Sequence, residues 1–260
     1  MEEKIKNRKG LKIVVLVEKV DNPIGTAVVM HGLGGYKEQP HIKTFAEAFK
    51  TKGYTTVTFD TTNSIGASEG KFEDATITNY YEDLEDVISW VEKQKWFKKP
   101  LILSGHSLGA FSAAFYSENY PSKVFAVAPI SPFVSGKLSV EAHKTYEPEE
   151  FSEWEKTGWQ IKESKSRPGV IKKLPWSHII NRLKYNLLEN TSPLKMPVLL
   201  IVGDNDTSTP AEHVKLFYDQ IPSKKKELHI IKGAPHTFKE KEHLEEIRKI
   251  FLSWLTKLRD

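Results

Sequence analysis

The apolar residues of this chain gather in short continuous runs, separated by longer stretches in which they recur every three to four positions. The runs show no regular polar alternation, which is typical of strands covered on both faces of a sheet. They lie at residues 26–30, 55–59, 101–103, 124–128 and 198–202. A β-branched run at 11–17 after the turn residues 7–10 predicts an N-terminal hairpin, and 227–231 predicts a further strand.

The stretches with helical spacing alternate with these runs along the chain. They predict helices at 43–52, 79–96, 107–118 and 243–258. Gly53 stands where a glycine commonly ends a helix, directly before the next strand. Strands that alternate with helices predict an α/β fold of three layers, with a mostly parallel sheet and helices on both faces.

One segment, 135–192, interrupts this rhythm. It contains no strong strand pattern, its charge density rises, and it carries Trp154, Trp159 and Trp176. We interpret it as an inserted lid (cap) subdomain, with residues 1–134 and 193–260 forming the core. Its aromatic residues would then line a pocket. The alternative is a helical pair whose tryptophans simply pack on the core.

Composition excludes several classes of protein. The 38 basic and 34 acidic residues are interleaved, so the net charge of +4 leaves no basic stripe for a nucleic acid. The chain has no cysteine, which excludes disulfides, thiolate nucleophiles and cysteine-bound metals. No apolar run reaches the roughly 18 residues of a membrane span, and the N-terminal residues lack the apolar core of a signal peptide. We therefore expect a cytoplasmic protein without stable membrane insertion.

The sequence Gly105-His106-Ser107-Leu108-Gly109 fits the G-x-S-x-G pattern, and it lies between a predicted strand and a predicted helix. A serine on such a sharp turn is held above the sheet. The neighbouring residues must then be small, because backbone segments approach closely there. The pattern and its context predict Ser107 as a nucleophile.

A serine nucleophile needs a base, and the base needs a carboxylate to orient it. His236 follows the strand predicted at 227–231, on a loop at the edge where chemistry collects in open α/β sheets. Two carboxylates follow the strand at 198–202. Asp206 lies further along the loop and is favoured, whereas Asp204 is better placed to cap the turn. The order Ser107, Asp206, His236 is the order of this class of site.

The developing oxyanion needs fixed hydrogen-bond donors, and backbone amides provide them. The residue after the nucleophile, Leu108, supplies one N–H group. The glycine-rich loop 31–35 supplies a second from Leu33, unless that loop is an ordinary turn. These are the candidate oxyanion-hole residues.

With these motifs the chain resembles an α/β-hydrolase-fold serine hydrolase. Pro40-His41-Ile42 and the sequence at 70–74 further resemble the cinnamoyl and feruloyl esterases with a small inserted lid. The resemblance implies a serine carboxylesterase that cleaves short-chain or aromatic esters by two-step acyl transfer. It also implies that Trp154, Trp159 and Tyr146 bind the acyl group, and that no metal or organic cofactor is needed.

Two departures leave the substrate class open. Residues 61–68 replace the Gly-His-Gly-x-Ser that such enzymes commonly carry, and Leu108 stands where the feruloyl group often has glutamine. The alternatives are a monoacylglycerol lipase or lysophospholipase, a peptidase, and a thioesterase. A low-turnover receptor module is the alternative outside enzymes. The mixed charge of 135–192 disfavours a lipase, because it leaves no continuous apolar surface for a membrane. We expect a monomer or a homodimer.

Overall fold

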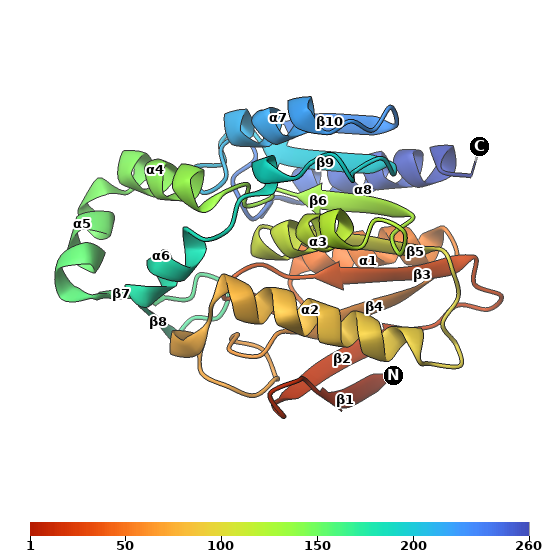
Figure 1. Ribbon diagram of the computed structural model, residues 1–260, viewed down its shortest axis with the longest axis horizontal. Helices are drawn as coiled ribbons and strands as arrows, with labels where there is room; N and C mark the ends of the chain where they lie inside the picture. Colours follow the sequence, from red (N-terminus) through yellow and green to blue (C-terminus); the bar gives the residue numbers. More distant parts are fainter. Residues whose placement is uncertain (260) are drawn as a thin grey trace.

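The computed structural model describes residues 1–259 and has a mixed sheet at its centre (Figure 1). The eight strands lie in the spatial order β1-β2-β4-β3-β5-β6-β9-β10. Their bounds are β1 Glu2–Lys6, β2 Lys12–Glu18, β3 Gly25–Met30, β4 Tyr54–Asp60, β5 Leu101–His106, β6 Ala126–Ile130, β9 Val198–Gly203 and β10 Lys226–Ile231. β1 and β2 form the predicted antiparallel hairpin, and β2 is also antiparallel to β4. Every later neighbour is parallel.

The strand order reverses between β3 and β5. The chain leaves β3 toward β4 at one side, returns to β5 on the other side, and then continues outward through β6, β9 and β10. At such a switch point the loops that follow two adjacent parallel strands diverge, which opens a crevice at their carboxyl ends. The loops after β3 and β5 are the two that carry the predicted oxyanion donors and the predicted nucleophile.

Helices cover both faces of the sheet (Figure 1). One face carries α2 (Ile77–Glu92), α3 (Leu108–Asn119) and α7 (Ala211–Gln220), and the other carries α1 (Pro40–Thr51) and α8 (Lys241–Lys257). A short 3-10 helix, η1 (Phe72–Asp74), precedes α2. In the part of the chain that the structure describes, no helix is long and apolar enough to cross a bilayer.

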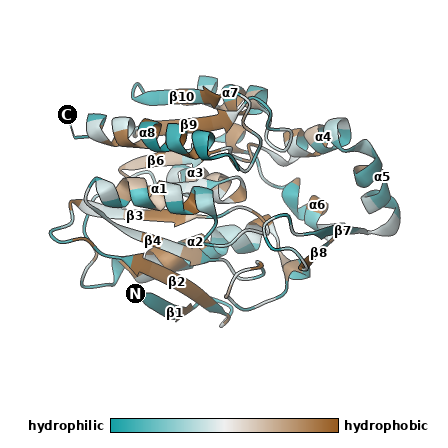
Figure 2. Ribbon diagram, turned by 180° about the vertical axis from the view of Figure 1, so that it is seen from behind, coloured by the Kyte–Doolittle hydropathy of each residue, from teal (hydrophilic) through white to brown (hydrophobic). Residues whose placement is uncertain are grey.

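Each central strand contributes side chains to the apolar cores on both faces of the sheet, because successive side chains of a strand point to opposite faces. In β3, Val28 and Met30 pack on the α2–α3–α7 side, whereas Ala27 and Val29 pack on the α1–α8 side. All four side chains are fully buried. Figure 2 shows hydrophobic residues concentrated on strands such as β2, β3 and β9. Burial on two faces explains the unbroken apolar runs, and the predicted three-layer α/β fold is confirmed.

The chain between β6 and β9, residues 131–197, forms a separate group of elements that we call the β6–β9 segment. It contains α4 (Gly136–Tyr146), α5 (Pro148–Thr157), β7 (Trp159–Glu163), β8 (Ile171–Pro175), α6 (Ser177–Arg182) and the 3-10 helix η2 (Leu187–Glu189). Figure 1 shows α4, α5, α6 and the β7–β8 pair beyond the edge of the sheet toward which β3 and β6 point. The segment therefore lies at the carboxyl ends of the parallel strands.

The antiparallel pair β7–β8 was not expected from the sequence. Both strands alternate between exposed and less exposed positions, and they carry several lysines and a glutamate. A hairpin with one face in solvent contains no continuous apolar run. The lack of a strong strand pattern in this segment therefore did not mean that it lacks strands.

Candidate active site

Ser107 occupies the sharp turn between β5 and α3. Its φ of 56° and ψ of −115° are a strained conformation for a residue with a side chain. The turn can form because the residues two positions before and after Ser107 are glycines. A Cβ on Gly105 would lie 2.5 Å from the backbone of Gly109, and a Cβ on Gly109 would lie 2.5 Å from the carbonyl oxygens of Met30 and His31. The two glycines thus let the end of β5, the start of α3 and the end of β3 approach one another.

The structure brings Ser107, His236 and Asp206 into one chain of hydrogen bonds. The Oγ atom of Ser107 lies 2.9 Å from Nε2 of His236. Nδ1 of the same ring lies 2.8 Å from Oδ2 of Asp206. Because a carboxylate only accepts, Nδ1 carries the proton and donates it. The Nε2 lone pair of the neutral ring is therefore left to accept the serine hydroxyl.

Asp206 is held as a carboxylate by the loop that follows β9. Its Oδ1 accepts hydrogen bonds from the backbone N–H groups of Ser208 (3.0 Å) and Thr209 (2.8 Å). Its Oδ2 also accepts one from the Thr209 hydroxyl at 2.8 Å. Burial opposes ionisation, but the electrostatic attraction of the adjacent His236 N–H and these hydrogen bonds outweigh it, and the pKa of Asp206 is lowered from its ordinary value.

The other carboxylate considered from the sequence has a different position. Asp204 lies on the exposed part of the same loop, and its Oδ1 accepts a 2.6 Å hydrogen bond from the Gly233 backbone N–H. It therefore ties the loop after β9 to the loop after β10, the loop on which His236 stands. Asp206, not Asp204, contacts the imidazole.

Two buried histidines fix the backbone around the site. Nε2 of His106 donates a 2.7 Å hydrogen bond to the carbonyl oxygen of His236. His31 donates from Nδ1 to the Gly32 carbonyl at 2.8 Å and accepts at Nε2 from the Thr61 N–H at 3.1 Å. Burial lowers the pKa of both rings from the ordinary value. Both stay neutral, and their hydrogen bonds fix the backbone around the site.

The glycine-rich loop after β3 is pinned beside Ser107. The Gly34 N–H donates to the Tyr80 hydroxyl at 3.1 Å, and Gly34 has a φ of +63° that favours glycine. No hydrogen bond within residues 1–259 is donated by the backbone N–H of Leu33 or of Leu108. Both residues line the same cavity as Ser107. The loop after β3 and the start of α3 thus each keep one amide at the site without an acceptor.

A cavity of about 270 Å³ opens next to the serine and extends under the β6–β9 segment. Its core-domain wall is formed by the nucleophile turn, the adjoining loops and nearby apolar side chains, namely Leu33, Phe72, Ile77, Ser107, Leu108, Thr207, Ser208, Thr209 and His236. The wall contributed by the β6–β9 segment is mostly polar, namely Phe133, Ser139, His143, Tyr146, Glu147, Gln160, Lys162, Lys172, Leu174, His178 and Arg182. The two walls therefore differ in chemistry.

Of the three aromatic residues expected to bind the acyl group, the structure places only Tyr146 on the cavity wall. Trp154 is 1% exposed and packs inside the segment, with its ring centroid 5.9 Å from that of Trp176. Trp159 is 43% exposed and lies on the outer face of β7. The expectation for the two tryptophans is wrong, because one fills the segment's own core and the other faces solvent.

The cavity instead receives side chains that the sequence analysis did not single out. The register pairs Gln160 with Leu174 and Lys162 with Lys172, so these four side chains share the inner face of the β7–β8 hairpin. His178 and Arg182 follow on α6. The signal in the sequence was the two-residue spacing of Gln160 and Lys162, and of Lys172 and Leu174, which puts each pair on one face of a strand. That spacing can be interpreted only once the hairpin is known.

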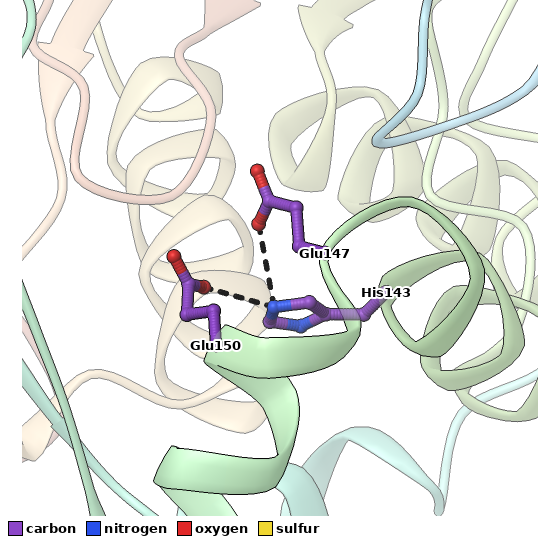
Figure 3. Close-up of side chains that lie close together, drawn as sticks. All are labelled: His143, Glu147 and Glu150. Carbon is purple, nitrogen blue, oxygen red and sulfur yellow. Dashed lines mark hydrogen bonds and ion pairs between the residues drawn. The ribbon is translucent and has the colours of Figure 1, made fainter.

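Figure 3 shows the one group of described residues that could present three ligand atoms to a metal, His143, Glu147 and Glu150. Nε2 of His143 lies 3.4 Å from Glu147 and 2.9 Å from Glu150. The ammonium of Lys162 forms ion pairs with both carboxylates. Because the Lys162 ammonium already pairs with both carboxylates, the cluster is a salt-bridge network that joins α4, α5 and β7.

Comparison with known proteins assigns the family. A family model described as serine aminopeptidase, S33 (Hydrolase_4) matches residues 21–242. The chain belongs to this family. It is accordingly a serine hydrolase of the α/β-hydrolase class.

Curated relatives of this S33 family member are distant. A 31.7 kDa protein of Escherichia coli, described as uncharacterized and located in the traX–finO intergenic region, is 27% identical over 258 residues, with 88% of this chain and 90% of that protein covered. The mitochondrial palmitoyl-protein thioesterase ABHD10 of Bos taurus is 26% identical over 205 residues. That match covers 76% of this chain and 62% of the bovine protein.

Solved structures show the same fold. Est1E from Butyrivibrio proteoclasticus, in a structure with bound ferulic acid, superposes with a TM-score of 0.80 at 21% identity, and the match covers 98% of both chains. Mouse alpha/beta hydrolase domain-containing protein 10 superposes with a TM-score of 0.79 at 21% identity over 99% of both chains. The predicted α/β-hydrolase resemblance is thereby confirmed at the level of the fold.

Proposed function

We propose that this S33 family member is a serine carboxylesterase that hydrolyses short-chain or aromatic esters, including esters of the cinnamoyl and feruloyl type. The observation that carries the proposal is the arrangement around Ser107. Its hydroxyl, on a left-handed turn, contacts a histidine that is oriented by a buried carboxylate. Two backbone amides without acceptors lie at the same cavity.

In the proposed reaction, Ser107 Oγ attacks the ester carbonyl carbon while Nε2 of His236 takes the hydroxyl proton. The negative charge on the carbonyl oxygen accepts hydrogen bonds from the Leu33 and Leu108 N–H groups. Collapse of this intermediate breaks the bond to the alcohol, which leaves with the proton from Nε2. Asp206 holds the imidazole in the required tautomer and stabilises the imidazolium.

Water then takes the place of the alcohol. His236 removes a proton from the water as its oxygen attacks the acyl-enzyme carbonyl. The second tetrahedral intermediate releases the acid, and Ser107 regains its proton from His236. Every group needed for both halves belongs to this chain, so the proposal requires no metal ion or organic cofactor.

The size and lining of the cavity support a small or aromatic acyl group. A volume of about 270 Å³ is near the lower limit of the ~300–1,000 Å³ typical of small-molecule sites. Phe72, Phe133 and Ile77 form an apolar wall next to Ser107. Est1E, which has the same fold, binds ferulic acid, an aromatic acid, and this adds support for an aromatic acyl group.

We also propose that residues 135–192 act as a lid over this site, with 1–134 and 193–260 as the catalytic core. In support, this part of the chain supplies about half of the residues that line the cavity. Its helices and hairpin stand beyond the carboxyl edge of the sheet (Figure 1), and Phe151, Trp154 and Leu174 join it to the apolar cluster that α2 and α3 share. A lid in this position covers the site while it stays packed on the core.

The test is a series of initial rates on p-nitrophenyl esters from two to sixteen carbons, together with methyl ferulate. Ser107→Ala removes the nucleophile. Ser117→Ala is the matched control, because that buried hydroxyl bonds only to the Ala113 carbonyl, inside α3. We expect a peak at short chains, turnover of ferulate, and a loss of several orders of magnitude in kcat only for Ser107→Ala. A residual rate near that of the unmodified protein would exclude Ser107 as the nucleophile.

A thioesterase is the second candidate, because the matched bovine relative is described as a palmitoyl-protein thioesterase. The family description likewise keeps a peptidase open. A rate maximum at long acyl chains would favour a lipase-like enzyme. If no oxygen ester is hydrolysed but a fluorophosphonate still labels Ser107, a thioester or peptide substrate is favoured. Absence of labelling would favour a binding module and overturn the proposal.

A further inference from the structure

The charged side chains that line the cavity are not balanced. They are Lys162, Lys172, Arg182 and Glu147, three cations against one carboxylate, and all four come from the β6–β9 segment. Cations in a concave site with low-dielectric walls attract anions more strongly than they would on an open surface. The two histidines of this wall add no positive charge to the cavity, because burial lowers the pKa of His143 and His178 and leaves both rings neutral.

One of the three cations already has partners. The Lys162 ammonium lies 3.0 Å from Glu147 and also forms an ion pair with Glu150, in the network shown with His143 in Figure 3. These two carboxylates are thus committed to Lys162. The charge available to a ligand comes from the other two cations.

Arg182 is the first of them. Its guanidinium donates a single hydrogen bond, at 3.2 Å, to the Ser139 hydroxyl, and it lies 5.9 Å from the ring centroid of Trp154. It forms no ion pair with any residue in 1–259. Burial lowers its pKa to about 10, so it remains charged at neutral pH. An arginine has five N–H donors, and partial burial without acceptors is costly unless a ligand supplies them.

Lys172 is the second. The hairpin register sets it directly opposite Lys162, and like charges in that position destabilise a strand pair. Its stem packs against the glycine-rich loop, since a Cβ on Gly34 would lie 3.0 Å from its Cδ. The only aromatic ring close to its ammonium is Phe72, with the centroid 5.9 Å away. Within the described chain it too has no carboxylate partner.

We infer that the substrate of this site carries an anionic group, a carboxylate or a phosphate, at a distance from the scissile ester, and that Arg182 and Lys172 bind it. The inference rests on the hydrolase function proposed above and adds a substrate class to it. An anion in the cavity would supply the acceptors that the guanidinium lacks, and it would relieve the repulsion between Lys162 and Lys172.

The experiment compares kcat/KM for matched ester pairs that differ in one charge. On the acyl side the pair is mono-p-nitrophenyl adipate and p-nitrophenyl hexanoate. On the alcohol side it is 4-acetoxybenzoate and methyl 4-acetoxybenzoate. A further ester, 4-acetoxyphenyl phosphate, distinguishes a phosphate from a carboxylate. We expect the charged member to be preferred about 10- to 100-fold in one of the two pairs, as for a charge-assisted hydrogen bond.

Three variants assign that preference to residues. Arg182→Gln and Lys172→Gln each remove one cation and should lower the ratio of charged to neutral kcat/KM about 10-fold or more. Arg182→Lys keeps the charge and should retain most of the ratio. Lys173→Gln is the matched control, because Lys173 neighbours Lys172 on β8 but is exposed on the outer face of the hairpin. It should leave the ratio unchanged.

A preference for the neutral member in both pairs, or a preference that persists in Arg182→Gln and Lys172→Gln, would overturn the inference while the esterase proposal stands. If no ester is hydrolysed, the esterase proposal fails. The inference is then decided by calorimetric binding of the same esters to Ser107→Ala. Tighter binding of the charged member would support it, and equal binding of both members would reject it.

Discussion

Glu118 offers a direct test of how burial controls the pH dependence of this protein's stability. Its side chain lies in the last turn of α3 and is 3% exposed. Among the described residues, neither carboxyl oxygen has a hydrogen-bond partner. Burial raises its pKa from the ordinary 4.5 to about 9. The negative end of the helix also disfavours a carboxylate at this position.

The sign and size of the effect follow from linkage. The folded state keeps the Glu118 proton up to about pH 9, whereas the unfolded chain loses it above pH 4.5. The free energy of unfolding is therefore fully preserved below pH 4.5 and falls as the pH rises toward 9. The slope is about 1.4 kcal/mol per pH unit, so about 4 kcal/mol is lost between pH 5 and pH 8.

Glu118→Gln removes the titration and keeps a neutral side chain of the same shape. We expect urea unfolding to give similar stabilities for the two proteins at pH 5, with the variant more stable by about 4 kcal/mol at pH 8. Glu155→Gln, which removes an exposed carboxylate on α5, is the control for a general charge effect. A Glu118→Gln variant that loses stability in parallel with the unmodified protein from pH 5 to pH 8 would refute the reasoning.

Three further substitutions probe the site and its support. Lys37→Met leaves Asp60 buried without the ammonium now 3.0 Å away, and should cost about 3–5 kcal/mol in urea unfolding. A loss below about 1 kcal/mol would mean that backbone donors alone hold that carboxylate. Gly109→Ala places a Cβ against the carbonyl oxygen of His31, which must displace the nucleophile turn. Fluorophosphonate labelling of Ser107 in the folded variant should therefore slow at least ~100-fold. An unchanged labelling rate would contradict the close approach of the two backbones. Asp206→Asn should lower kcat about 10⁴-fold on the best p-nitrophenyl ester, and a loss under tenfold would exclude this carboxylate from orienting the imidazole.

The sheet and the residues around Ser107 could be predicted because the constraints on them show in short stretches of sequence. A strand covered on both faces must be continuously apolar, and a nucleophile turn must carry glycine at Gly105 and Gly109, where backbones meet. Ser107 follows β5 directly, and Asp206 and His236 lie on the loops that follow β9 and β10. Parallel strands end at one edge, so the loops had to converge there, and the structure places these side chains in contact.

The cavity wall could not be predicted in the same way. A hairpin with a polar inner face and a solvent-exposed outer face has no single periodic signature, so Lys162 and Lys172 resembled surface residues in the sequence. The acyl-binding role predicted for Trp154 and Trp159 was wrong for a related reason. A small unit needs large side chains for its own centre, and Trp154 serves that need. Which face of a segment meets the substrate depends on tertiary packing that the sequence pattern does not contain.

The hydrogen bond between Ser107 and His236 joins residues 129 positions apart, and it has a consequence for synthesis of the protein on the ribosome. β10 must leave the exit tunnel and pair with β9 before the imidazole can reach the hydroxyl. A nascent chain that already carries the complete nucleophile turn is therefore still without its base. Contacts of such long sequence separation also form late in folding, because loop closure must precede them. Hydrolytic activity should consequently appear in a single step near the end of translation, and truncated chains that lack β10 should present a serine that no fluorophosphonate labels.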